Sequence, residues 1–196
     1  MLEYIHGRVE ELTPAYAVID VAGVGYLVNI SLNTFTAMQN SETARLYLYE
    51  AIREDAYTLY GFADKTERAL FLLLISVSGV GAATARMMLS SLSVPEICEA
   101  INTGDERLLK SVKGLGAKSA QRIIVDLRDK IAQIDAGESS PSGLTASSSE
   151  AKNEALAALT MLGFAPAQAR KALEKVLSES PNAPVDELIK KSLKLM

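Results

Sequence analysis

The stretch Leu74-Ile75-Ser76-Val77-Ser78-Gly79-Val80-Gly81-Ala82-Ala83-Thr84-Ala85 decides the fold of the middle of this chain, because its pattern occurs twice. The second copy begins 35 residues later and reads Leu109-Lys110-Ser111-Val112-Lys113-Gly114-Leu115-Gly116-Ala117-Lys118-Ser119-Ala120. In each copy a helical run leads into a glycine, an apolar residue and a second glycine, and small residues then begin another helix. The repeat predicts two helical hairpins of one design.

Each predicted turn holds two glycines around one apolar residue: Gly79, Val80 and Gly81 in the first copy, and Gly114, Leu115 and Gly116 in the second. Glycine permits the tight turn and a positive φ, and we expect the apolar residue to insert into the core. The helix that follows then presents unpaired N–H groups and the positive end of its dipole, which suit a phosphate. This is the helix-hairpin-helix pattern, and it predicts DNA binding that does not depend on base sequence.

The charge of the chain is informative only by segment. The total of -4 gives no indication of a nucleic-acid partner. Residues 1–64, however, carry three Lys/Arg against nine Asp/Glu, whereas residues 65–134 carry ten against seven. The basic segment is the one that contains both repeats, with Lys118 and Arg122 in the second copy, so attraction to phosphate is expected there.

The N-terminal segment has the pattern of a small β-barrel. Five short runs are rich in β-branched and aromatic residues, at 4–9, 16–21, 26–30, 45–49 and 57–62, and Ala22-Gly23-Val24-Gly25 forms a turn between two of them. Five strands at this spacing favour the oligonucleotide-binding (OB) barrel. Tyrosines of these runs could stack on bases, but the negative charge of the segment favours packing roles.

The chain as a whole is predicted to be an α+β multidomain protein. We expect an OB-fold barrel over 1–63, a tandem helix-hairpin-helix domain over 64–134, a flexible Ser-rich linker over 135–149 and a small three-helix domain, similar to ubiquitin-associated domains, over 150–196. The linker prediction depends on composition, since ten of its fifteen residues are Ser, Thr, Gly or Pro. The last domain shows helical patterning over 154–162, 166–177 and 185–195.

Several kinds of site are absent from the sequence. With His6 and Cys98 as the single histidine and cysteine, neither a metal site nor a catalytic triad is expected, and no cofactor is expected. The nucleotide-binding pattern GxxxxGK[ST] fails, because Val112 and Ala117 stand where it needs glycine. We see no signal peptide and no run of about 20 apolar residues, so we expect a cytoplasmic protein without a membrane partner.

The order of barrel, paired hairpins, linker and small helical domain resembles the RuvA family of bacterial Holliday-junction-binding proteins, over the whole chain. The most specific segments are Gly23-Val24-Gly25-Tyr26, Arg53-Glu54-Asp55-Ala56, Leu59-Tyr60-Gly61-Phe62, Gly79-Val80-Gly81 and Gly114-Leu115-Gly116-Ala117-Lys118-Ser119-Ala120-Gln121-Arg122. The resemblance implies structure-specific, sequence-independent binding of four-way junction DNA by a homotetramer, or by an octamer of two tetramers, in homologous recombination and DNA repair.

The resemblance also implies roles for particular residues. The glycine turns, Lys118 and Arg122 would contact DNA, and Glu54 and Asp55 would form an acidic pin at the junction centre. Residues 150–196 would bind the hexameric ATPase RuvB, with the resolvase RuvC as a further candidate partner. The chain itself would be a non-catalytic subunit of the branch-migration helicase complex. One departure is that no lysine follows Gly81, and whether Arg86 replaces it is left open.

Two other functions are compatible with parts of the sequence. A helix-hairpin-helix DNA glycosylase needs an acidic catalyst on a helix after the hairpin, and Asp135 is the nearest match, at the start of the expected linker. A protein-interaction module without DNA binding is compatible with residues 151–164 alone.

Overall fold

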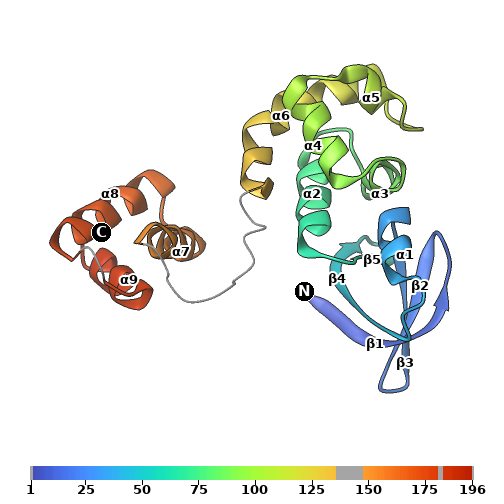
Figure 1. Cartoon of the computed structure of the whole chain (residues 1–196), viewed down its shortest axis with the longest axis horizontal. Helices are drawn as coiled ribbons and strands as arrows, with labels where there is room; N and C mark the ends of the chain where they lie inside the picture. The colour runs from blue at the N-terminus through green and yellow to red at the C-terminus, as the bar shows by residue number, and fades with distance from the viewer. Residues whose placement is uncertain (1, 136–147, 181–182, 196) are drawn as a thin grey trace. The chain divides into compact units, whose positions relative to one another are not determined.

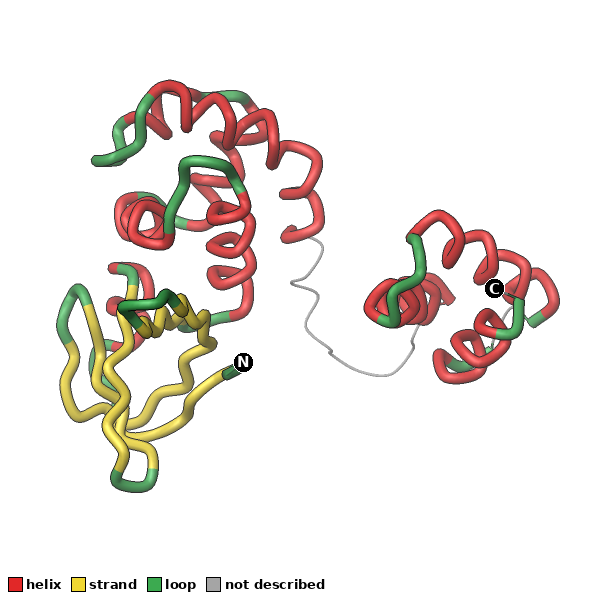
Figure 2. Tube along the Cα trace, turned by 180° about the vertical axis from the view of Figure 1, so that it is seen from behind, coloured by secondary structure: helices red, strands yellow, loops and turns green. Residues whose placement is uncertain are grey.

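The computed structural model describes residues 2–135, 148–180 and 183–195 and divides the chain into two compact units (Figure 1). The first unit is Met1–Ser139 and the second is Ser140–Met196. In the first unit all strands gather at one end and the longer helices at the other (Figure 2). The expected fold class is therefore confirmed: a barrel, a helical hairpin region and a C-terminal helical domain.

The N-terminal strands close into a barrel, as predicted. Its strands are β1 (Tyr4–Leu12), β2 (Tyr16–Val21), β3 (Val24–Ile30), β4 (Thr43–Ile52) and β5 (Tyr57–Phe62), in the order β1-β2-β3-β5-β4. The β3–β5 pair is parallel and every other pair is antiparallel. Alternate residues fill the interior, among them Ala17, Ile19, Val28, Ile30, Leu46 and Leu48.

One element of the barrel region was not predicted from the sequence. Helix α1 (Leu32–Met38) lies between β3 and β4, where we expected no element. Its N-cap is Ser31, whose hydroxyl accepts a hydrogen bond from the Thr34 N–H. Seven residues are too few for a clear helical period. The turn after β2 is also shorter than expected, because β3 already begins at Val24.

The helical part of the first unit consists of α2 (Lys65–Ser76), α3 (Ala82–Ser91), α4 (Val94–Thr103), α5 (Glu106–Lys110) and α6 (Ala117–Asp135). Asp64 caps α2 by accepting from the Glu67 N–H, and Ser93 with Glu96 forms the capping box that starts α4. The apolar faces of these helices share one core, which includes Leu70, Leu74, Met88, Ile101, Ile123 and Leu127. Both hairpins are therefore fixed to a single packed body.

The barrel and the helices of this unit are joined by aromatic packing and by hydrogen bonds. Phe71 of α2 packs against Tyr49 of β4 and Tyr60 of β5, with ring centroids 5.3 and 5.5 Å apart. These two tyrosines therefore have the packing role that the charge of the segment favours. Arg68 of α2 adds a hydrogen bond of 3.1 Å to the Glu3 carbonyl.

The expected linker lies between two helices. Helix α6 continues through Asp135, and helix α7 (Ser148–Met161) begins before residue 150. Asp135 is thus the last residue of a helix and not the first of a linker. The prediction of a flexible linker otherwise falls on residues 136–147, which lie outside the described residues.

The second unit is a bundle of three helices that pack against one another: α7, α8 (Pro166–Glu179) and α9 (Val185–Leu193). Its small core consists mainly of Ala155, Leu159, Ala169, Leu173, Val176 and Leu188. After α7, Gly163 takes φ +97°, and the Gly163 and Phe164 N–H groups donate to the Thr160 and Leu159 carbonyls. Within the described residues, no helix is long and apolar enough to cross a membrane.

Candidate nucleic-acid interface

The two hairpins are built by the same backbone hydrogen bonds. In the first, the donors and acceptors are Val77 N to Leu74 O (3.2 Å), Val80 N to Val77 O (3.0 Å) and Ala85 N to Gly81 O (2.9 Å). In the second they are Val112 N to Leu109 O (3.2 Å), Leu115 N to Val112 O (3.1 Å) and Ala120 N to Gly116 O (3.0 Å). Each bond of one hairpin has its counterpart 35 residues away, so the sequence repeat is a structural repeat.

The apolar residue of each turn enters the core, as the sequence predicts. Val80 and Leu115 are only 5% and 6% exposed. The preceding glycines, Gly79 and Gly114, take φ values of +90° and +91°, which L side chains rarely adopt. Each turn is therefore held from inside by its apolar side chain, while its backbone faces outward.

The second glycine of each turn has no such conformational requirement. Gly81 and Gly116 have no positive φ, and a Cβ added at either would meet nothing within 4 Å. Gly81 is the N-cap of α3 and no side chain caps that helix. The first N–H groups of α3 and α6 have no carbonyl partner within their helices. Open backbone at a helix start is a suitable site for a phosphate oxygen.

The cations of the second repeat lie at the start of α6. Lys118 is exposed, and no described carboxylate forms a salt bridge with it. Arg122 is also exposed, and its Nη1 donates to the carbonyl of Ser78, 3.4 Å away. A Cβ on Gly79 would lie 3.7 Å from the Ser119 hydroxyl. The first turns of α6 therefore lie against the first hairpin.

Arg86, the basic residue of α3, is turned toward the barrel. Its Nη1 donates to the Ala15 carbonyl at 2.8 Å and to Asn29 Oδ1 at 3.1 Å, both in the barrel. The side chain thus links α3 to the barrel. A sequence pattern alone could not show which way this side chain points.

The acidic pair lies in the turn between β4 and β5. Glu54 and Asp55 are both exposed, and the Arg53 N–H donates to the Ala56 carbonyl at 2.8 Å to close the turn. No salt bridge to either carboxylate occurs among the described side chains. Within the described part of the chain, both carboxylates are therefore exposed and form no ion pair.

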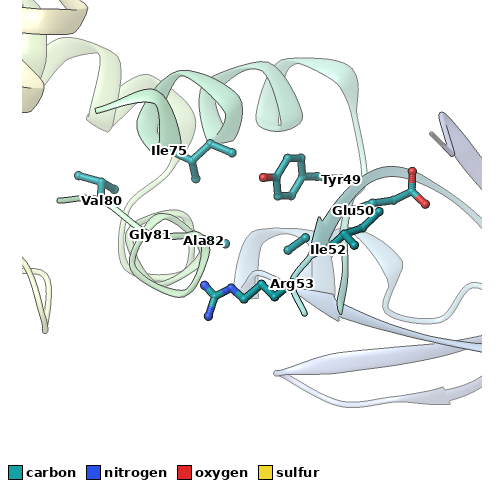
Figure 3. A pocket seen from close by; sticks show the side chains of 9 residues that line it. Tyr49, Glu50, Ile52, Arg53, Ile75, Val80, Gly81 and Ala82 are labelled. Atoms are coloured by element: carbon teal, nitrogen blue, oxygen red, sulfur yellow. The ribbon is translucent and has the colours of Figure 1, made fainter. Parts of the chain in front are cut away.

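A groove of about 380 Å³ lies between the end of β4 and the first hairpin (Figure 3). Tyr49, Ile52 and Arg53 line it on the barrel side, and Val80, Gly81 and Ala82 on the hairpin side. Arg53 is therefore a candidate functional residue that the sequence does not predict, although it directly precedes Glu54 and Asp55. Nothing in the sequence indicates that this turn and the first hairpin are neighbours.

Comparisons with known proteins agree with this arrangement. Residues 1–61 match the family described as RuvA N terminal domain, residues 71–129 the SAM-like helix-hairpin-helix tandem, and residues 150–196 the RuvA C-terminal domain. Relatives named Holliday junction branch migration complex subunit RuvA are similar along their whole length. The one from Bacteroides fragilis is 57% identical over 199 residues, covering 99% of both chains.

Two further relatives with this name are more distant. The protein from Christiangramia forsetii is 47% identical over 194 residues, covering 99% of both chains, and the one from Porphyromonas gingivalis is 46% identical over 202 residues, covering both completely. Identity of this level along the whole chain, together with the three matched segments, leaves one conclusion: the chain belongs to the RuvA family.

Proposed function

We propose that this chain is the junction-binding, non-catalytic subunit of a branch-migration complex. It binds four-way DNA junctions by structure and without regard to sequence, as a homotetramer or as two tetramers on one junction. The observation that carries the proposal is the pair of hairpins with matching backbone hydrogen bonds in the basic segment of the chain, in the same unit as an exposed acidic turn.

The hairpins would bind DNA mainly through their backbones. Because Val80 and Leu115 are buried, the turns offer N–H groups and not side chains to a phosphate. Lys118 adds positive charge at the start of α6, and the Arg122 guanidinium lies beside Ser78 of the first hairpin. Phosphates occur at every nucleotide, so contacts of this kind hold the duplex without reading its sequence.

The acidic turns would select junctions over continuous duplex. Fourfold symmetry would bring the Glu54 and Asp55 pairs of four subunits near one axis. A duplex lying across that axis would place its phosphates within about 8–10 Å of these carboxylates, where salt does not fully screen the repulsion. An open junction keeps its phosphates away from the axis. The acidic pair therefore lowers affinity for continuous duplex more than affinity for the junction.

The second unit would recruit the motor. As residues 150–196 match the RuvA C-terminal domain, we assign to them the binding of the ATPase RuvB, which supplies the energy for branch migration. The resolvase RuvC is a further candidate partner of the DNA-bound complex. We also propose that the chain acts in the cytoplasm. Matches to the RuvA N-terminal and C-terminal domains, and similarity to RuvA proteins along the whole chain, favour this function over that of a DNA glycosylase.

A gel-shift series tests the proposal directly. The full chain is titrated against a four-way junction, a linear duplex and a single strand that share one sequence. Preferential binding of the junction is expected, and it should persist when the sequence of the arms is scrambled. Equal affinity for junction and duplex, or release of free base from damaged duplex, would contradict the proposal.

A further inference from the structure

The two hairpins share a backbone but not their charges. The second carries three cations in and just after its turn, and the positions 35 residues earlier hold small, polar or apolar residues. The pairs are Lys113 with Ser78, Lys118 with Ala83, and Arg122 with Met87. The first hairpin therefore has a phosphate-binding backbone without a cation of its own.

Helix α3 cannot correct this deficit. Arg86 is the one basic residue in its sequence, and its guanidinium is held by the Ala15 carbonyl and the Asn29 side chain. A cation for the start of α3 must therefore come from another element. Arg122 of α6 reaches the other end of the first hairpin, at the Ser78 carbonyl, but it does not line the groove at Gly81 and Ala82.

Arg53 is placed to be that cation. It lies just after β4, on the barrel side of the groove. Its guanidinium points toward Gly81 and Ala82 on the hairpin side (Figure 3). Within residues 2–135, 148–180 and 183–195, no side chain forms a salt bridge or hydrogen bond with the Arg53 guanidinium. Its donors are therefore available to a ligand.

The other charged residue of the groove does not neutralise Arg53. Glu50 points away from the hairpin (Figure 3), and its carboxylate accepts hydrogen bonds of 2.6 Å from the Tyr57 hydroxyl and from the Leu2 N–H. The groove is thus positive where it meets the start of α3. Its volume of about 380 Å³ far exceeds the ~30 Å³ share of one water molecule, so a hydrated phosphate group fits.

We propose that Arg53 binds a DNA phosphate in this groove together with the N–H groups at the start of α3, and so replaces the cation that the first hairpin lacks. The inference rests on the proposed junction binding. A guanidinium suits the role because its planar set of donors can hold two phosphate oxygens at once. The turn between β4 and β5 would then attract a DNA strand through Arg53 and repel it through Glu54 and Asp55. These opposite charges would guide the DNA strand along the first hairpin and away from the acidic pair.

The test compares variants of the full chain on one immobile four-way junction over a range of salt concentrations. We expect Arg53→Gln to lower affinity about tenfold and to reduce the salt slope by about one for each phosphate that it no longer neutralises. Arg53→Lys should retain more of the affinity than Arg53→Gln. Arg45→Gln is the matched control, because it removes the same charge from an exposed position on β4, the strand that ends just before Arg53, and it should change affinity less than twofold.

A rescue locates the effect at the first hairpin. Ala83, the counterpart of Lys118, lies in the first turn of α3, and adding Ala83→Lys to Arg53→Gln should restore most of the affinity. Wild-type affinity in Arg53→Gln would overturn the inference, and so would a defect that Ala83→Lys leaves unrepaired. Failure of the wild-type chain to prefer the junction would instead refute the proposed function. Unchanged melting temperatures would show that the variants are folded.

Discussion

The Thr34 hydroxyl donates a 2.6 Å hydrogen bond to the buried carboxylate of Glu67, and this contact joins α1 of the barrel region to α2 of the helical region. Ser31 donates to the same carboxylate. The Thr34 oxygen also accepts from the Ala63 N–H at 3.1 Å. Glu67 is only 2% exposed, so this network fixes the barrel, and with it the acidic turn, relative to the hairpins.

Burial raises the pKa of Glu67 above its ordinary value of 4.5, against the opposing effect of the two hydroxyl donors. The folded state therefore holds this proton more firmly than the unfolded state, and its contribution to stability is full below the ordinary pKa. It disappears as the pH rises through the higher pKa of the folded protein. We expect the free energy of unfolding of the wild type, relative to Glu67→Gln, to fall as the pH rises above 4.5.

Urea unfolding of both proteins at several pH values measures this difference. Because Glu67→Gln cannot ionise, it lacks this part of the pH dependence. Its absolute stability is expected to be lower in acid, where the wild-type carboxyl is neutral and accepts from both hydroxyls. A difference that stays constant across the pH range would show that Glu67 does not titrate differently in the folded state.

Substituting the hairpin glycines should separate folding from binding. Gly79→Ala and Gly114→Ala place a side chain at φ near +90°, which costs about 1–2 kcal/mol and should lower the melting temperature. Gly81→Ala and Gly116→Ala meet open space, so their melting temperatures should stay near wild type. Their new methyl groups would stand in the path of the phosphate, and junction affinity should fall.

Calorimetry and gel shifts on the four single variants check this. The second pair provides the decisive comparison, since both variants are expected to fold normally. If Gly81→Ala and Gly116→Ala bind junctions as tightly as wild type, the backbone of the turns does not touch DNA.

The hairpins illustrate what the sequence can predict here. Glycine spacing, the buried Val80 and the repeat at 35 residues are local patterns, and the structure confirms each of them. The direction of Arg86 and the proximity of Arg53 to Gly81 depend on how the barrel packs against α3. Local patterns carry no information about that packing, and helix α1 was missed because so short a helix leaves little periodicity.

Lys118→Ala should weaken binding to every junction sequence by about the same factor, because a phosphate contact carries no base information. The salt slope should become shallower by about one for each phosphate that the lysine neutralises in the wild type. Lys130→Ala, an exposed lysine near the other end of α6, is the control and should change little. Binding measured on several unrelated junction sequences distinguishes this result from a weakening confined to particular sequences.

Removing the second unit should separate DNA binding from motor recruitment. A chain of residues 1–139 retains the barrel, both hairpins and the whole of α6. We expect it to bind junctions with near wild-type affinity and to form the same oligomer by light scattering, but to support no RuvB-driven branch migration. Failure of this fragment to bind junctions would mean that the second unit takes part in holding DNA.

Neutralising Glu54 and Asp55 should strengthen the binding of linear duplex. Both carboxylates are exposed and form no salt bridge with any described side chain, so Glu54→Gln with Asp55→Asn should leave the melting temperature unchanged. Repulsion of phosphates near the fourfold axis would disappear, so affinity for linear duplex should rise while affinity for the junction changes less. The ratio of junction affinity to duplex affinity, measured at one salt concentration, should therefore decrease.

The control for this double variant removes two carboxylates from elsewhere on the barrel. Glu10→Gln with Glu11→Gln changes the net charge by the same amount, and both residues are exposed on β1. If the effect came from net charge alone, both double variants would strengthen duplex binding equally, and Glu54 and Asp55 would have no special role. A pin at the junction centre requires a different result. Duplex affinity should rise only in the Glu54 and Asp55 variant, and the rise should be largest at low salt.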